Sequence, residues 1–203
     1  MRRSTERSDP PGSERSYILI VKTCNYDYNL IMNNPLIGII MGSDSDLPVM
    51  QGAGRALEEF GIPFEISVLS AHRTPDQTHE YVKTAHDRGL KVIIAAAGGA
   101  AHLAGVAAAN TTLPVIGVPM KSNLDGIDSL VSTMQMPPGV PVATVAIDGA
   151  KNAALLAIQI LAVSDDKITQ ALKNYKQKMG EDILGKNKKL QSLGSDKYLE
   201  QSK

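Results

Sequence analysis

Five short strand-like segments recur between residues 36 and 147, and helical or polar stretches separate each from the next. Most of them are continuous apolar runs, which are typical of strands buried on both faces of a sheet. Strands that alternate with helices need crossover connections, and these give a parallel sheet with helices on both sides. The sequence therefore predicts an α/β fold with a five-stranded parallel sheet. The predicted strands are residues 36–41, 63–69, 92–97, 114–119 and 142–147.

Helices are predicted in the intervening stretches, and glycines mark the ends of the first two. Gly61 and Gly89 each follow a stretch with an apolar face, as expected at a helix C-terminus. The predicted helices are 48–60, 75–88, 102–110, 152–162 and a last one capped by Ser164. Helices that alternate with most of the strands favour a flavodoxin-like, three-layer αβα sandwich.

The chain is expected to form one domain over residues 35–179. Residues 1–34 are polar and differ in character from the rest of the chain, so we interpret them as a loosely held extension or a wrongly assigned start, with Met32 as the alternative start. Residues 180–203 contain the polar runs Lys186-Asn187-Lys188-Lys189 and Gly194-Ser195-Asp196-Lys197 and are predicted to be a solvated C-terminal tail.

The overall charge excludes several classes of partner. The chain carries 21 basic and 21 acidic side chains, so it has no basic excess for nucleic acid or an anionic membrane surface.

No apolar run approaches the roughly 18 residues of a membrane helix, and no signal-peptide core follows the N-terminus. Cys24 is the only cysteine, which rules out an intramolecular disulfide. A cytoplasmic location is therefore expected.

Residues 70–75, Ser-Ala-His-Arg-Thr-Pro, lie between a predicted strand and a predicted helix. Thr74 is the expected N-cap, Pro75 the first helical residue, and Gln77 the partner that closes a capping box. His72 and Arg73 then lie at the carboxyl end of a strand, where open α/β sheets bind ligands. The histidine can exchange protons near neutral pH, and the arginine can bind phosphate or carboxylate. The alternative is an ordinary solvated turn.

Two further loops follow predicted strands. Residues 42–46, Gly-Ser-Asp-Ser-Asp, combine small residues and hydroxyls before a helix N-terminus, which suits an anion, and Asp46 could accept from ribose hydroxyls. The loop matches neither a Walker nor a dinucleotide motif, and an N-cap cluster is an equal alternative. In the other loop, Gly98 and Gly99 let a ligand ring approach the backbone, and His102 contacts that ligand or caps its helix.

Other residues carry weaker signals. His79 and His86 fall among charged neighbours on one helix and are expected on the surface. Residues 120–123 and 134–139 are predicted to be loops that could form a lid, with methionines that pack. No residues have the spacing of metal ligands, so no metal is expected. No serine-hydrolase motif is present either, so that reaction class is not expected. The remaining pattern, a phosphate-and-ribose pocket with one or two histidines over a small flat ring, predicts proton-transfer chemistry on a nucleotide.

Five motifs occur in order and at compatible spacing, at residues 42–46, 70–75, 98–103, 135–142 and 152–157. Together they resemble the class I N5-carboxyaminoimidazole ribonucleotide mutases of purine biosynthesis, in the phosphoribosylaminoimidazole carboxylase catalytic subunit family. The resemblance covers residues 35–178. Two positions depart from the usual pattern: Ala104 replaces a common proline, and Ala96 replaces a common glycine.

The resemblance implies a cofactor-free isomerisation in which a carboxylate moves from the exocyclic amine of the imidazole ribonucleotide to ring carbon four. His72 would be the catalytic acid and base. Freed carbon dioxide would rest on a floor formed by two glycines. The resemblance also implies a homo-octamer, for which helix 152–162 offers an apolar surface. The candidate substrate-binding residues are Ser43, Ser45, Asp46, Ser70, Arg73, Gly98, Gly99 and His102.

Two alternatives remain open. One is a class II carboxylase of the same fold, which uses free carbon dioxide and the uncarboxylated ribonucleotide. The other is a non-enzymatic flavodoxin-like module, either a flavin carrier or a phospho-receiver. The absence of tryptophan weighs against flavin stacking, and a receiver would need an aspartate where Ala97 and Gly98 follow the third strand.

Overall fold

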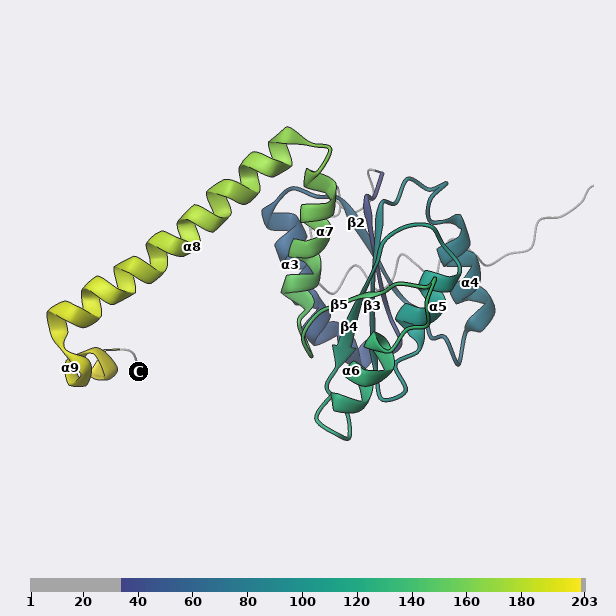
Figure 1. The fold of residues 1–203 in the computed structure, drawn as a ribbon, viewed down its shortest axis with the longest axis horizontal. Coiled ribbons are helices and arrows are strands. Elements are labelled where there is room, and N and C mark those ends of the chain that lie inside the picture. Colours follow the sequence, from purple (N-terminus) through teal and green to yellow (C-terminus); the bar gives the residue numbers. More distant parts are fainter. Residues whose placement is uncertain (1–33, 202–203) are drawn as a thin grey trace, which may run out of the picture.

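The computed structural model describes residues 34–201 and contains the predicted parallel sheet (Figure 1). All four strand pairs are parallel, and the strand order is β2-β1-β3-β4-β5. This is the order of flavodoxin-like sheets, so the predicted fold class is confirmed. The strands are β1 Ile37–Met41, β2 Phe64–Val68, β3 Val92–Gly98, β4 Val115–Met120 and β5 Ala143–Thr144.

Helices cover both faces of the sheet, because successive side chains of a buried strand point to opposite sides. Ile39 of β1 belongs to a core with α3 (Leu47–Glu59) and α7 (Ala150–Ala162). Ile40 belongs to a second core with α4 (Pro75–Thr84) and α5 (Leu103–Ala109). Figure 1 shows these two helix pairs on opposite sides of the sheet.

Two predicted elements end earlier than expected. β5 has two residues and not six, because residues 146–149 turn into α7, with the Gly149 N–H donating to the Ala146 carbonyl. α4 ends at Thr84 and not at residue 88, since turns closed by hydrogen bonds such as Leu90 N–H to the Ala85 carbonyl replace its last turn.

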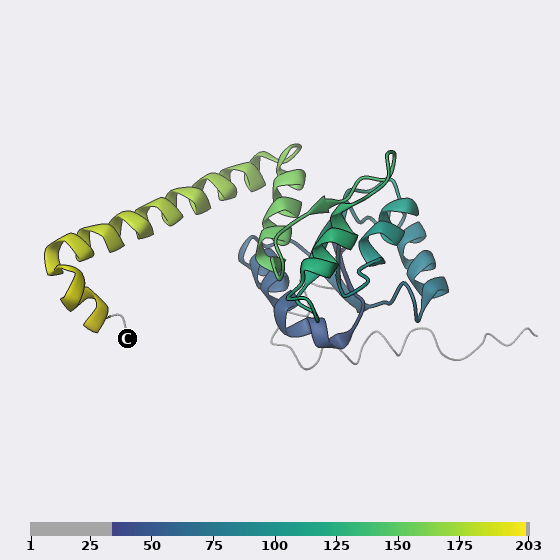
Figure 2. The same cartoon turned by 60° about the horizontal axis from the view of Figure 1, so that its bottom comes forward.

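The last predicted helix is α8, Asp166–Leu193, and Asp165 caps it instead of Ser164. The Asp165 carboxylate accepts from the N–H groups of Lys167 and Ile168. Only the start of α8 packs on the domain, where Leu172 is buried. The rest of α8 projects away from the domain, and α9 (Ser195–Glu200) folds back at its end (Figures 1 and 2).

The predicted boundary at residue 179 therefore falls inside a helix. The side chains of 180–200 are largely exposed, as expected for a solvated segment, but the backbone is helical. The division into three segments stays a prediction, and the N-terminal one lies, except for Asn34, outside the described residues.

One helix was missed by the sequence interpretation: α6, Ile127–Met134, which lies between the two predicted lid loops. Its polarity is the reverse of the usual pattern. The residues it buries are Ser129 and Thr133, whereas three of its four large apolar side chains, all except Leu130, are about half exposed. These exposed residues, with Leu124 just before the helix, are Leu124 (65%), Ile127 (55%), Val131 (48%) and Met134 (51%), and we call them the α6 stripe.

Close packing of α6 on β4 depends on Gly117. A Cβ at this position would collide with the Thr133 methyl and would lie 3.0 Å from Val142 Cγ1 and 3.3 Å from Ala104 Cβ. We therefore expect Gly117→Ala to lower the free energy of unfolding by about 1–3 kcal/mol, measured by urea denaturation. Gly180→Ala is the matched control, because nothing lies within 4 Å of that Cβ and alanine favours a helix. Equal unfolding free energies for the two variants would contradict this packing argument.

Candidate active site

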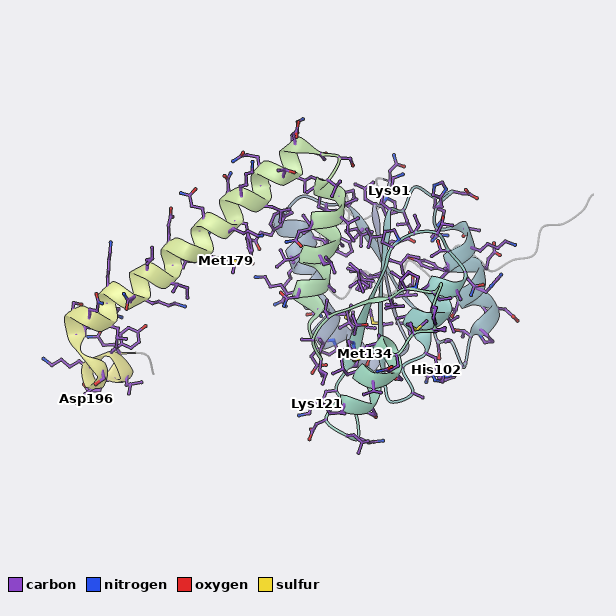
Figure 3. All side chains as sticks on the ribbon, viewed as in Figure 1. Lys91, His102, Lys121, Met134, Met179 and Asp196 are labelled. Atoms are coloured by element: carbon purple, nitrogen blue, oxygen red, sulfur yellow. The ribbon has the colours of Figure 1, made fainter. Side chains whose placement is uncertain are left out.

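The loops that follow β1, β2, β3 and β4 meet at one edge of the sheet and enclose a cavity of about 450 Å³. In Figure 3, His102 and Lys121 lie at this end of the sheet, whereas Lys91, which precedes β3, lies at the opposite end. Carboxyl ends of parallel strands are the usual ligand-binding edge of such sheets. Eight of the nine predicted site residues line the cavity: Ser43, Ser45, Asp46, Ser70, His72, Arg73, Gly98 and His102.

Gly99 is the predicted residue that does not line the cavity. Its φ is +64°, a left-handed conformation that glycine adopts easily, so its role is to turn the chain after β3. Lys121 and Ser122, which the sequence places in a loop that could form a lid but not among the site residues, also lie in the cavity wall. Their position directly after β4 was the available signal, because the other lining loops also follow strands.

His72 and His102 come together from loops 30 residues apart. Nε2 of His72 lies 2.8 Å from Nδ1 of His102, and the rings meet edge to face with centroids 4.8 Å apart. One nitrogen must donate the shared proton and the other must accept it. The pair can therefore take up one further proton and keep this bond, but not two, because two N–H groups would then face each other.

Arg73 is held from two sides. Its Nη2 donates to the Gly42 carbonyl at 2.5 Å, and its Nε donates to the Ser70 hydroxyl at 3.4 Å. These two bonds use two of the five guanidinium N–H donors, which leaves three for a ligand anion. The arrangement fixes a cation between the loops that follow β1 and β2.

Thr74 holds the same loop in a way that the sequence interpretation did not foresee. It occupies the N-cap position of α4, but its side chain makes no capping bond. Instead its hydroxyl accepts from the Ser70 N–H at 2.9 Å and lies 3.1 Å from the Ser70 carbonyl. The predicted capping box is therefore wrong, and the threonine closes the loop that carries His72 and Arg73.

The loop after β1 brings the hydroxyl groups of Ser43 and Ser45 into contact. Ser43 caps the short 3-10 helix Asp44–Asp46, and its hydroxyl accepts from the N–H of Ser45 at 3.3 Å and from the hydroxyl of Ser45 at 2.8 Å. Asp46 follows in the same turn and is half-buried. Burial raises the pKa of the Asp46 carboxyl above its usual value of 3.8, against the hydrogen bonds in this loop that lower it.

A raised pKa means that native Asp46 keeps its proton to a higher pH than the unfolded chain does. The ionised carboxylate therefore costs stability once the pH has risen from about 3.8 through the native pKa. We expect Asp46→Asn to be more stable than the wild type at neutral pH, with a difference that opens as the pH rises through this window and then stays constant. Urea denaturation between pH 3.5 and 7 measures it, with Asp44→Asn as the control at an exposed neighbour. A difference that closes with rising pH would contradict the assignment.

The remaining predictions concern residues outside the cavity. His79 and His86 are exposed on α4 and just after it, as expected. Between residues 34 and 201, no three His, Cys, Asp or Glu side chains are arranged to hold a metal ion. No helix in that same part of the chain has the length and apolarity that crossing a membrane requires.

Comparison with known proteins gives one consistent family. The family model described as AIR carboxylase matches residues 36–182. The chain is 59% identical over 166 residues to an N5-carboxyaminoimidazole ribonucleotide mutase of Pyrococcus horikoshii, which covers 81% of this chain and 94% of that protein. It is 58% identical over 167 residues to a phosphoribosylaminoimidazole carboxylase of Candida albicans, which covers 82% of this chain but 29% of that longer protein.

The fold comparison agrees. A crystal structure of Treponema denticola PurE superposes with a TM-score of 0.70 and 31% sequence identity, covering 77% of this chain and 98% of that one. A family match over most of the domain, a relative at 59% identity that is matched over nearly its whole length and a solved structure with the same fold all point the same way. The chain belongs to the AIR carboxylase family.

Proposed function

We propose that this chain is an N5-carboxyaminoimidazole ribonucleotide mutase of de novo purine biosynthesis, which forms 4-carboxy-5-aminoimidazole ribonucleotide. The observation that carries the proposal is one cavity with a histidine pair beside an arginine and serine cluster. The chain also spans 94% of the Pyrococcus mutase, whereas the Candida carboxylase is more than three times as long as the matched region.

The cluster around Arg73 suits the ribose phosphate. The guanidinium has three donors left, and the Ser43 and Ser45 hydroxyls lie beside it in the cavity wall. Asp46 would repel the phosphate but accepts hydrogen bonds from ribose hydroxyls. The ribose phosphate therefore lies along the loops after β1 and β2, and the imidazole extends toward the loop after β3.

The histidine pair suits the proton transfers. The carbamate N–C bond breaks and releases carbon dioxide, and His72 donates one proton to the exocyclic amine nitrogen. Ring carbon four then attacks carbon dioxide, a C–C bond forms, and the ring proton returns to His72. The net reaction moves no proton to solvent. A histidine pair that gains and loses a single proton fits this order of proton transfers.

Freed carbon dioxide needs a wall without competing nucleophiles. Ala97, Gly98 and Leu103 line the cavity close to the histidines and give it an apolar side. Gly98 adds no side chain there, and a Cβ would make ordinary van der Waals contacts with Met120 Cβ at 3.5 Å and Ser122 Cβ at 3.6 Å. This side of the cavity is our candidate resting place for carbon dioxide.

The experiment that tests the function offers two substrates in parallel, without ATP or added metal, and follows product formation by absorbance. One is the N-carboxylated ribonucleotide, and the other is the uncarboxylated ribonucleotide with low bicarbonate. Fast product from the first alone supports the mutase. Efficient product from the second would assign the chain to the carboxylases instead. If neither substrate were converted, the chain would still belong to the family, but the proposed activity would be refuted.

We further propose that the subunits form a homo-octamer. One face of α7, the helix that the sequence offers as a contact surface, is buried within the subunit at Ala153, Ala157 and Ile158. Its other face carries partly exposed apolar side chains such as Leu155 and Leu156, so a contact through α7 stays a prediction. The α6 stripe and the outer part of α8 are the exposed apolar candidates. Light scattering after gel filtration should give about eight times the 21.7 kDa of one chain, and a monomeric mass would contradict the proposal. A cytoplasmic location and the absence of a cofactor stay predictions.

A further inference from the structure

The polar inner side of α6 is bonded to the loop that follows β3. The Ser132 hydroxyl accepts from the Ala101 N–H at 3.0 Å, and the carbonyls of Ser129 and Gly99 lie 3.2 and 3.3 Å from it as acceptors. One side chain therefore contacts both ends of the turn from Gly99 to Ala101. Ala101 is itself buried, so its N–H depends on this partner.

This turn carries two parts of the candidate active site. His102 directly follows Ala101, and its Nδ1 meets Nε2 of His72 at 2.8 Å. Gly98, which directly precedes the turn, lines the cavity beside Ala97 and Leu103. A shift of the turn would therefore move the apolar side of the cavity and one member of the histidine pair together.

α6 reaches the cavity wall at a second place. The Ser122 hydroxyl donates to the Asp128 carboxylate at 2.6 Å, and this bond lowers the pKa of Asp128. The Ser129 hydroxyl, by contrast, donates to the Met120 and Gly126 carbonyls, which lie outside the Gly98–Ala101 segment. Of the α6 hydroxyls in the described part of the chain, Ser132 is thus the one bonded to the segment beside the histidines.

We propose that Ser132 is a positioning residue that prevents the loss of carbon dioxide during the reaction. By holding the Gly99–Ala101 turn, it keeps the apolar side of the cavity closed behind carbon dioxide and keeps His102 against His72. This inference rests on the proposed mutase function. When the turn loosens, cleavage of the carbamate N–C bond still occurs. Carbon dioxide then escapes, and the uncarboxylated ribonucleotide is released after taking up one proton.

The test follows the fate of the carboxyl carbon. Substrate with a 13C carbamate is converted in unlabelled bicarbonate, and mass spectrometry gives the 13C fraction in the product and the amount of uncarboxylated ribonucleotide. Spontaneous loss without enzyme is subtracted. For the wild type we expect nearly complete retention of the label. For Ser132→Ala we expect the ratio of uncarboxylated ribonucleotide to carboxylated product to rise about tenfold or more, with KM changed by less than about twofold.

Two control variants separate positioning from stability. Ser132→Thr keeps the hydroxyl and should restore retention of the label. Ser129→Ala removes a hydroxyl from the same helix and is expected to lower the melting temperature while retention stays at the wild-type level. If Ser132→Ala does not fold, Ser132→Cys carries the test, because a thiol is a weak acceptor of similar size and should give an intermediate loss.

The outcomes distinguish this inference from the proposed function. Full retention of the 13C label by Ser132→Ala would overturn the role of Ser132 but leave the proposed mutase function intact. An equal loss of the label in Ser129→Ala would have the same consequence. A folded Ser132→Ala protein that neither decarboxylates nor isomerises would also overturn it, since decarboxylation is expected to persist. A wild type that gives no carboxylated product would instead overturn the proposed function.

Discussion

His72→Asn is expected to lower kcat for the N-carboxylated ribonucleotide by about 10²–10⁴-fold, with KM nearly unchanged. Asparagine retains a similar shape and can still make a hydrogen bond, but it cannot take up and return a proton. The side chain lies in the cavity wall and does not contribute to either hydrophobic core, so the free energy of unfolding should stay close to that of the wild type. Steady-state kinetics and urea denaturation measure the two effects.

His79→Asn is the matched control, because His79 is exposed on α4 outside the cavity. It should leave both kcat and stability at wild-type values. If His72→Asn retained near-normal turnover, the proton-transfer role would have to pass to another group. His102→Asn would then be the next variant, since His102 is the hydrogen-bond partner of His72.

Arg73→Ala should raise KM about 10–150-fold, because a hydrogen-bonded charged group contributes roughly 1.5–3 kcal/mol to binding. The ribose phosphate is not altered by the reaction, so its contacts are equal in the bound substrate and in the transition state. Loss of such contacts weakens binding and leaves kcat largely unchanged. The separate changes in KM and in kcat, and not their ratio, are therefore diagnostic.

Arg88→Ala provides the matched control for a lost arginine. Arg88 pairs with Glu65 at 2.9 Å and lies outside the cavity, so its removal can affect stability but should not change KM. An unchanged KM for Arg73→Ala would refute the phosphate assignment. A loss confined to kcat would instead place Arg73 beside the migrating carboxylate.

Much of this arrangement could be predicted from the sequence because the relevant signals are local. Continuous apolar runs indicated the parallel strands, and the fold class then placed their carboxyl ends at one edge. The sequence therefore predicts that three loops with polar or small residues share one site. Eight of the nine predicted residues do line a common cavity.

The features that the sequence did not predict depend on tertiary contacts or on competition between local hydrogen bonds. α6 buries Ser129 and Thr133 and exposes apolar side chains, so its position could not be derived from the rule that apolar residues face the core. Thr74 had the sequence of an N-cap, but a bond to Ser70 competed for its hydroxyl. The contact of His72 with His102 spans 30 residues and requires the strand order to be known.

The peptide at Gly42 has a consequence for ligands. Its N–H donates to the Ala96 carbonyl of β3 at 3.0 Å, and its carbonyl accepts from Arg73. The Arg73 guanidinium is thus linked through Gly42 to β1 and β3, and β3 leads into the turn that precedes His102. In the proposed binding mode, the spacing between the phosphate and the imidazole ring is therefore set by loops that are hydrogen-bonded to the sheet backbone. An inhibitor with a stiff scaffold of matching length should gain affinity over a flexible one with the same groups, because it gives up less conformational freedom on binding.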